Sequence, residues 1–254
     1  MTVSIRRSLR RLEELGMIIQ TPYELEVQLR KTPPQTGHER AFFVVVYNEM
    51  RTFTDCFASS SFVQREKTIS FYNQQNEALP TIFNRVVKEH AGDDCWFVFC
   101  HQDFILKEDL QVRLRGLDIN TIYGPIGVRV GDKRFYGQII QTNNSPKGIP
   151  LAELTMVHTL DEMCIIAHSS AFKEGLTFDE KFKFHFYGAD LCMNAYVTGF
   201  DVCALQLNCQ HKSRTLGGDK TSESYLEALS LFREKWVKFL PIRTTTALIK
   251  REQS

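Results

Sequence analysis

The chain has 254 residues, of which 43% are hydrophobic and 24% charged, so it carries enough apolar material for one large domain or two small ones, and extended disorder is not expected. The formal net charge is only +1 at pH 7, so no nucleic-acid partner is expected, because such a partner would need a local basic face. Its seven cysteines are scattered without a C-x-x-C pair, and no stretch approaches ~18 apolar residues, so we expect a cytoplasmic protein with reduced thiols.

Residues 1–38 are predicted to form a short basic helix followed by a polar linker. Four arginines lie close together at its start: Arg6, Arg7, Arg10 and Arg11. They could contact anionic lipid, which would make the protein peripheral at the inner membrane face. A solvated face or a contact with a protein partner is the alternative that the charge pattern favours.

The next segments alternate between strand and helix patterns. Apolar runs at 41–47 and 96–100 predict strands buried on both faces, and 68–73 predicts a third, shorter strand. Residues 48–62 have helical spacing, and 77–90 place their apolar residues on one helical stripe that Gly92 could end. This alternation predicts a mostly parallel, doubly wound α/β sheet.

The second half is less regular. Residues 128–142 read as a hairpin around Gly131 and Asp132, and 156–168 as a strand interrupted at Asp161 and Glu162. A short helix at 190–199 closes with Gly199 and leads to a strand at 200–208. An amphipathic helix at 224–240 precedes a polar tail, so we predict one domain over residues 39–240 and a tail over 241–254.

The strand at 96–100 runs directly into His101, Gln102 and Asp103. In a parallel sheet this end of the strand lies on the rim where such folds bind ligands. An imidazole and a carboxylate two residues apart suit a divalent ion, although one pair cannot hold it alone. Taken by themselves, these residues are better explained as the ordinary polar end of a strand.

Two further clusters carry candidate chemistry. Asp190 could be the N-cap of the helix at 190–199, or a carboxylate at the rim that takes a proton from a hydroxyl. His211, Lys212 and Arg214 lie in a glycine-containing loop that could supply a third metal ligand and positive charge for a diphosphate. The other histidines, His185 among them, are expected to be structural.

No P-loop, G-x-G-x-x-G or G-x-S-x-G motif occurs, so P-loop hydrolysis, Rossmann dinucleotide binding and the serine hydrolase elbow lack sequence support. Five segments, taken in order, instead resemble the glycosyltransferase-like branch of the family 2 glycosyltransferases. They are FFVVVYNE at 42–49, SFYNQQNEALPTIFNRVV at 70–87, WFVFCHQDF at 96–104, LTFDEKFKFHFYGADLCMNAYVTGF at 176–200 and QHKS at 210–213. The similarity extends over residues 41–240.

The resemblance implies a GT-A type fold: a Rossmann-like, mostly parallel sheet with helices on both faces and a smaller antiparallel extension. The HQD triplet replaces the usual Asp-any-Asp motif, so Asp103 would bind a divalent ion, with His101 on the metal or beside the ribose. Imidazole ligation would favour Mn²⁺ over Mg²⁺. His211 would add a metal or diphosphate contact, and Asp190 would be the general base of an inverting transfer.

The resemblance also implies a nucleotide-sugar site. Its residues would be Tyr47, Asn48, Glu49, Asn73, Gln74, Asn84, Arg85, His101, Gln102 and Lys212. Tyr47 could stack on the base, whereas Arg85 could equally be an exposed helix residue. Asp161 and Glu162 are expected to face the sugar or acceptor, unless they serve a salt bridge.

The resemblance implies an inverting glycosyltransferase that moves a sugar from a nucleotide-diphosphate sugar, UDP-sugar above others, to a hydroxyl of a glycan, lipid-linked or other acceptor, as in polysaccharide biosynthesis. One alternative is a nucleotidyltransferase. Another is a catalytically weakened nucleotide-sugar-binding module, which the missing first Asp of the metal motif would favour. A monomer and a homodimer are both compatible with the sequence.

Overall fold

The computed structural model describes residues 40–63, 67–213 and 220–251. The predicted basic helix at 1–38, and Arg214 of the predicted binding loop, lie outside these residues. Within the described ranges, no helix combines the length and apolar character needed to cross a membrane.

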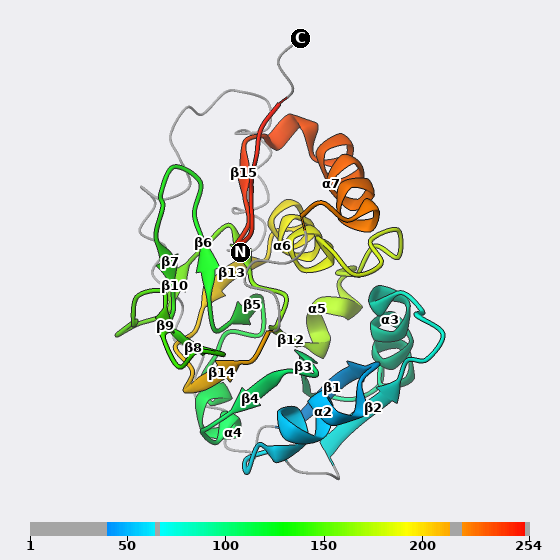
Figure 1. The fold of residues 1–254 in the computed structure, drawn as a ribbon, viewed down its shortest axis with the longest axis vertical. Coiled ribbons are helices and arrows are strands. Elements are labelled where there is room, and N and C mark those ends of the chain that lie inside the picture. Colours follow the sequence, from blue (N-terminus) through cyan, green and yellow to red (C-terminus); the bar gives the residue numbers. More distant parts are fainter. Residues whose placement is uncertain (1–39, 64–66, 214–219, 252–254) are drawn as a thin grey trace.

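A seven-stranded sheet forms the centre of the molecule, in the order β10-β13-β5-β12-β3-β1-β2 (Figure 1). Its strands are β1 (Ala41–Tyr47), β2 (Thr68–Tyr72), β3 (Trp96–His101), β5 (Thr121–Gly124), β10 (Thr155–Met156), β12 (Cys164–His168) and β13 (Asp201–Ala204). The strands β3, β1 and β2 are parallel, and their register pairs Val46 with His101 and Tyr47 with Tyr72. The carboxyl ends of these three strands therefore meet at one edge, as predicted.

Smaller sheets extend one side of the molecule. A four-stranded sheet is built from β4 (Phe104–Leu106), β14 (Cys209–His211), β8 (Ile139–Gln141) and β9 (Pro146–Lys147). A three-stranded sheet contains β11 (Thr159–Leu160), β6 (Gly127–Val128) and β7 (Phe135–Tyr136). The antiparallel pairing of β6 with β7 confirms the hairpin predicted around Gly131, whose φ of 80° suits a glycine turn.

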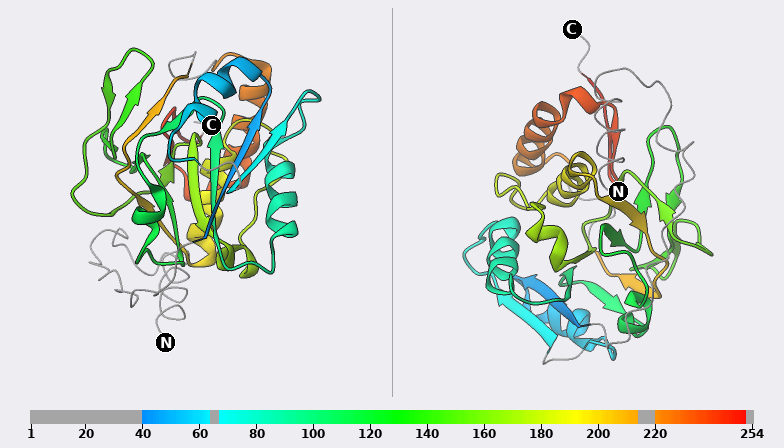
Figure 2. Two further views of the ribbon diagram at one scale, coloured as in Figure 1. Left: turned by 90° about the horizontal axis from the view of Figure 1, so that it is seen from below. Right: turned by 180° about the vertical axis from the view of Figure 1, so that it is seen from behind.

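Helices cover both faces of the central sheet (Figure 2). They are α2 (Met50–Asp55), α3 (Leu79–Glu89), α4 (Leu110–Leu114), α5 (Ser169–Lys173), α6 (Tyr187–Thr198) and α7 (Glu223–Lys235), with 3-10 turns at Phe57–Ser59 and Val237–Phe239. One core packs α3, α5, α6 and α7 against the sheet, and a second core on the other face includes α4. Each face of β1 and β3 is therefore buried, which explains their uninterrupted apolar sequences.

The observed fold confirms the predicted α/β architecture with a mostly parallel sheet, but differs from it in detail. β12 runs antiparallel between β3 and β5, and β10 runs antiparallel to β13. Helix α6 begins at Tyr187, three residues before the predicted start, and ends at Gly199 as expected, with a left-handed φ of 93°. Residues predicted as a polar tail instead form the antiparallel pair β15 (Ile242–Arg243) and β16 (Leu248–Ile249), because Ile242 and Ile249 are buried in the core.

Candidate functional site

Three side chains with metal-ligating atoms meet where the large sheet passes into the four-stranded one. His101 ends β3, Asp103 lies in the two-residue turn before β4, and His211 ends β14. Strand β14 pairs with β4, and the Lys212 N–H donates to the Asp103 carbonyl at 2.9 Å, so the two chain segments are fixed side by side. One ligand atom from each of the three residues lies within 4.8 Å of the other two.

The geometry of this cluster fits a divalent cation. Asp103 Oδ1 and His211 Nε2 lie 3.2 Å apart, yet both are buried and neither has a properly oriented hydrogen-bond partner among the described residues. The two atoms can pair with each other when the His211 ring is protonated, and a divalent cation would take the place of that proton between them. An Asp and two His residues also form a donor set suited to first-row divalent metals.

Electrostatics favour the ligating forms of Asp103 and His101. Burial raises the pKa of Asp103, but the His211 and His101 rings outweigh this effect, so the pKa lies below its usual value and the carboxylate is ionised. Burial lowers the pKa of His101 and keeps its ring neutral. In His211 burial acts in the same direction, but Asp103 overrides it and raises the pKa.

A tyrosine on α6 orients His101. The Tyr187 hydroxyl donates to the Glu162 carbonyl at 3.2 Å and lies 2.9 Å from His101 Nε2. With the hydroxyl proton on the Glu162 carbonyl, the contact between Tyr187 and His101 places a proton on His101 Nε2. The other ring nitrogen, Nδ1, then keeps a free lone pair and lies 4.0 Å from Asp103 Oδ1. Tyr187 thus selects the tautomer that a metal ligand needs.

The cluster opens into a cavity of about 250 Å³. Asp161 and Glu162, which connect β11 to β12, lie in its wall, as do Lys147, Tyr225 and His185. Further lining residues are His101, Asp103, Ile139, Gln141, Thr142, Leu160, Phe184, Phe186, Ala189, His211, Ser213, Thr244, Thr245 and Thr246. The wall is rich in hydroxyl, carboxyl and aromatic groups, which are the groups that bind sugar hydroxyls and sugar faces.

The two neighbouring acids in the wall differ in charge state. Burial raises the pKa of Asp161, but Lys147, 3.9 Å away, and His211 bring it below its usual value. Burial raises the pKa of Glu162 to about 8, and the hydrogen bonds from the Gly188 and Ala189 N–H groups offset only part of this effect. The cavity therefore combines an ionised carboxylate with one that binds a proton near neutral pH.

Several wall residues were missed by sequence reasoning. Lys147 follows an irregular loop and has no motif around it. His185 was expected to be structural, but it lines the cavity. The run Thr244 to Thr246 could have been noticed, because three threonines between two isolated isoleucines suggest a turn between short strands, and this turn forms one side of the cavity.

The predicted nucleotide residues of β1 are occupied by internal contacts. The Tyr47 ring stacks on Phe53 at 4.1 Å and on Tyr72 at 5.2 Å between centroids, so both its faces are covered. Stacking of Tyr47 on a base is therefore not supported, whereas Tyr72 remains 48% exposed. The N–H groups of Asn48 and Glu49 both donate to Gln102 Oε1 at 3.1 Å, and Gln102 Nε2 donates to Asn48 Oδ1 at 2.9 Å. Gln102 thus joins the carboxyl end of β1 to the carboxyl end of β3.

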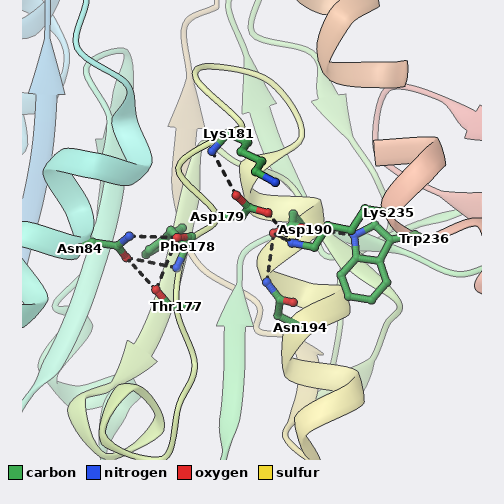
Figure 3. A network of polar contacts seen from close by, with 9 residues as sticks. All are labelled: Asn84, Thr177, Phe178, Asp179, Lys181, Asp190, Asn194, Lys235 and Trp236. Carbon is green, nitrogen blue, oxygen red and sulfur yellow. Dashed lines mark hydrogen bonds and ion pairs between the residues drawn. The ribbon is translucent and has the colours of Figure 1, made fainter. Parts of the chain in front are cut away.

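The remaining predicted nucleotide residues lie away from the cavity. Asn73 forms a loop with Glu77 through hydrogen bonds of 2.8 and 2.9 Å, and Arg85 forms an exposed ion pair with Glu77 at 3.1 Å. Gln74 is exposed and is not among the cavity residues. Asn84 donates to the Phe178 carbonyl at 2.9 Å and ties α3 to the loop before α6 (Figure 3). Lys212 is exposed beside the cluster but does not line the cavity either.

Asp190 is fully buried and does not line the cavity. Its carboxylate accepts hydrogen bonds from Trp236 Nε1 at 2.8 Å and Asn194 Nδ2 at 3.0 Å, and Lys235 Nζ lies 2.8 and 3.0 Å from its two oxygens (Figure 3). Asp190 is also not the N-cap, because that position belongs to Phe186 and Asp190 lies within the first turn of the helix. The geometry therefore corrects the prediction of Asp190 as a cap, and its contacts join α6 to α7 and do not support the predicted role as base.

No protein-family model matches the chain, and its sequence matches no curated protein. The fold is nevertheless similar to solved structures. The crystal structure of GalNAc-T7 with UDP, GalNAc and Mn²⁺ has a TM-score of 0.52 and 10% identity, over 77% of this chain and 48% of that one. The crystal structure of S. aureus TarS has a TM-score of 0.50 and 13% identity, over 78% of this chain and 40% of that one.

The fold and the site define a GT-A type α/β protein. The likeness to GalNAc-T7 and TarS confirms that the chain has the glycosyltransferase-like GT-A fold implied by its motifs. It spans about half or less of the length of these two proteins, and identities of 10% and 13% establish the fold alone. Activity must be argued from the site.

Proposed function

We propose that this chain is a metal-dependent glycosyltransferase that uses a nucleotide-diphosphate sugar, with UDP-sugars favoured, and transfers the sugar with inversion to a hydroxyl of a glycan or other acceptor. The observation that carries the proposal is the cluster of His101, Asp103 and His211, which faces a hydroxyl-rich cavity at the rim of a GT-A sheet. In open α/β folds this rim is where ligands bind.

The residues of the cluster would hold a divalent cation, and two imidazole nitrogens favour Mn²⁺ over Mg²⁺. When bound, such an ion offsets negative charge on a departing diphosphate. Lys147 lies in the cavity wall, 3.9 Å from Asp161, and adds positive charge there. GalNAc-T7 was crystallised with UDP, GalNAc and Mn²⁺, which guides the choice of ligands to test.

A donor panel tests the proposal. Thermal unfolding is recorded with UDP-, GDP- and CDP-sugars, with and without Mn²⁺, because a ligand at a hundred times its Kd stabilises by about 2.7 kcal/mol. Release of nucleoside diphosphate is then measured with glycan acceptors. Asp103→Ala should abolish both the Mn²⁺-dependent shift and the release, whereas the exposed control Glu89→Gln should preserve them. Absence of a shift with every donor would contradict the proposal, and release of pyrophosphate would indicate a nucleotidyltransferase.

A second candidate is a nucleotide-sugar-binding module without turnover. The withdrawal of Asp190 from the cavity favours it, because the carboxylate expected to act as the base is held by Lys235 and Trp236. A donor-induced shift without release of nucleoside diphosphate, in the presence of a broad set of acceptors, would support the module.

A further inference from the structure

The proposed reaction needs a carboxylate that can take the proton of the acceptor hydroxyl. In the described part of the chain, the cavity wall contains three carboxylates, those of Asp103, Asp161 and Glu162. Asp103 belongs to the metal-ligating cluster. Asp161 faces Lys147 at 3.9 Å and accepts the Met163 N–H at 3.2 Å, so its charge is already balanced. Glu162 is the carboxylate that remains.

Among the described residues, Glu162 is held by backbone groups rather than by a cation. Its Oε1 accepts the Gly188 N–H at 3.0 Å, in the first turn of α6. Hydrogen bonds from the start of a helix fix a carboxylate in place without consuming all of its lone pairs. A side chain held in this way is oriented and still able to accept a proton.

The local sequence of α6 permits this approach. A Cβ at position 188 would lie 2.7 Å from Glu162 Cγ and 2.8 Å from Ile165 Cδ1, so any residue other than glycine would push Glu162 away. The residue before the helix, Phe186, takes a left-handed φ of 64°, a costly conformation for a residue with a side chain. The start of α6 is therefore shaped around the Glu162 carboxylate, on the cavity side of the helix.

We propose that Glu162 is the general base of the transfer. This assignment rests on the proposed function. The Glu162 carboxylate accepts the proton of the acceptor hydroxyl as the hydroxyl oxygen bonds to the anomeric carbon of the donor. The bond from that carbon to the diphosphate oxygen breaks, and the nucleoside diphosphate leaves with the electron pair. The charge balances, because the proton stays on Glu162 and the negative charge leaves with the diphosphate.

The surroundings of Glu162 suit a base. Burial raises its pKa to about 8, and the ionised Asp161 acts in the same direction. The other titratable groups that sense its charge are Tyr187 and Cys192 on α6 and Tyr225 on α7, all of which are neutral acids near pH 7. A carboxylate whose pKa lies near the working pH takes up a proton more readily than an ordinary glutamate.

The test is Glu162→Gln, which keeps the side-chain volume and the acceptor for the Gly188 N–H but removes the base. With a donor identified by thermal shift, we expect transfer to fall about 10²–10⁴-fold while donor affinity changes less than about threefold. In the Glu162→Gln variant, the fall of kcat/KM on the acidic side of the pH profile should disappear. Glu89→Gln is the matched surface control, and Asp190→Asn should retain transfer per folded molecule.

A second variant separates a base from a helix cap. Glu162→Asp keeps a carboxylate but withdraws it by one methylene, so a base predicts a large loss of kcat with donor affinity preserved, whereas a structural cap predicts nearly full activity. Wild-type transfer by Glu162→Gln would overturn the assignment and leave the proposed function intact. If the wild-type chain releases no nucleoside diphosphate from any donor it binds, the proposed function fails, and the assignment of Glu162 fails with it.

Discussion

The Asp190 network provides the sharpest stability prediction. Replacing Asp190 by alanine should lower the free energy of unfolding by about 3–5 kcal/mol, as expected when one partner of a buried ion pair is removed. The side chain is 0% exposed, and its loss leaves the buried Trp236 indole N–H without an acceptor. After the substitution, Lys235 still pairs with Asp179 at 2.7 Å, so its ammonium group keeps a counter-ion and the loss of stability is limited.

This loss should be measured by urea unfolding and calorimetry. For a chain of this size, 1 kcal/mol corresponds to about 2–4 °C, so the Tm should fall by about 6–20 °C. Asp190→Asn keeps the volume and one acceptor oxygen, and should lose less. A loss below about 1 kcal/mol for Asp190→Ala would refute the structural role. Loss of transfer in a fully folded Asp190→Asn variant would show that Asp190 takes part in the reaction.

Three further predictions concern the site and its surroundings. Tyr187→Phe should weaken Mn²⁺ binding about 10–100-fold in calorimetry, because His101 loses the partner that selects its tautomer; unchanged affinity would contradict this role. Gly188→Ala should cost about 1–3 kcal/mol of stability and also reduce transfer, since its Cβ displaces Glu162; a variant with full activity would argue against the required close approach. Burial lowers the pKa of His158 to about 4, below the unfolded value near 6.5, so stability is lost as pH falls through this window. His158→Asn should reduce the slope of stability against pH there by about one proton, and an unchanged slope would contradict the shift.

The elements that the sequence predicts well are those with strong local patterns. The strands β1 and β3 are uninterrupted apolar runs because both faces are buried, and α3 has a clear stripe. The exits of parallel strands share an edge, so His101 and Asp103 could be placed at the rim in advance. His211 was harder, since its closeness to Asp103 depends on the pairing of β14 with β4.

The errors come from long-range partners that local sequence does not reveal. Asp190 looked like a cap or a base, but its role is set by Lys235 and Trp236, which are 45 and 46 residues away. Tyr47 looked available for stacking, but Phe53 and Tyr72 come from other elements to cover it. A residue type and its place near a strand end indicate where a ligand could bind; they do not indicate which groups are already occupied.

The hydrogen bonds of Gln102 show that the three residues of the HQD triplet have two different roles, one structural and one in the cavity. His101 and Asp103 line the cavity. The Gln102 side-chain amide instead accepts the N–H groups of Asn48 and Glu49 and donates to the Asn48 side chain, just after the end of β1. A related chain that keeps the glutamine but loses the acid should therefore retain this junction of strands without the ability to bind an ion. In comparisons of divergent sequences, the middle position would report on the scaffold and the flanking positions on the chemistry. The triplet should accordingly be scored as two separate signals rather than as one motif.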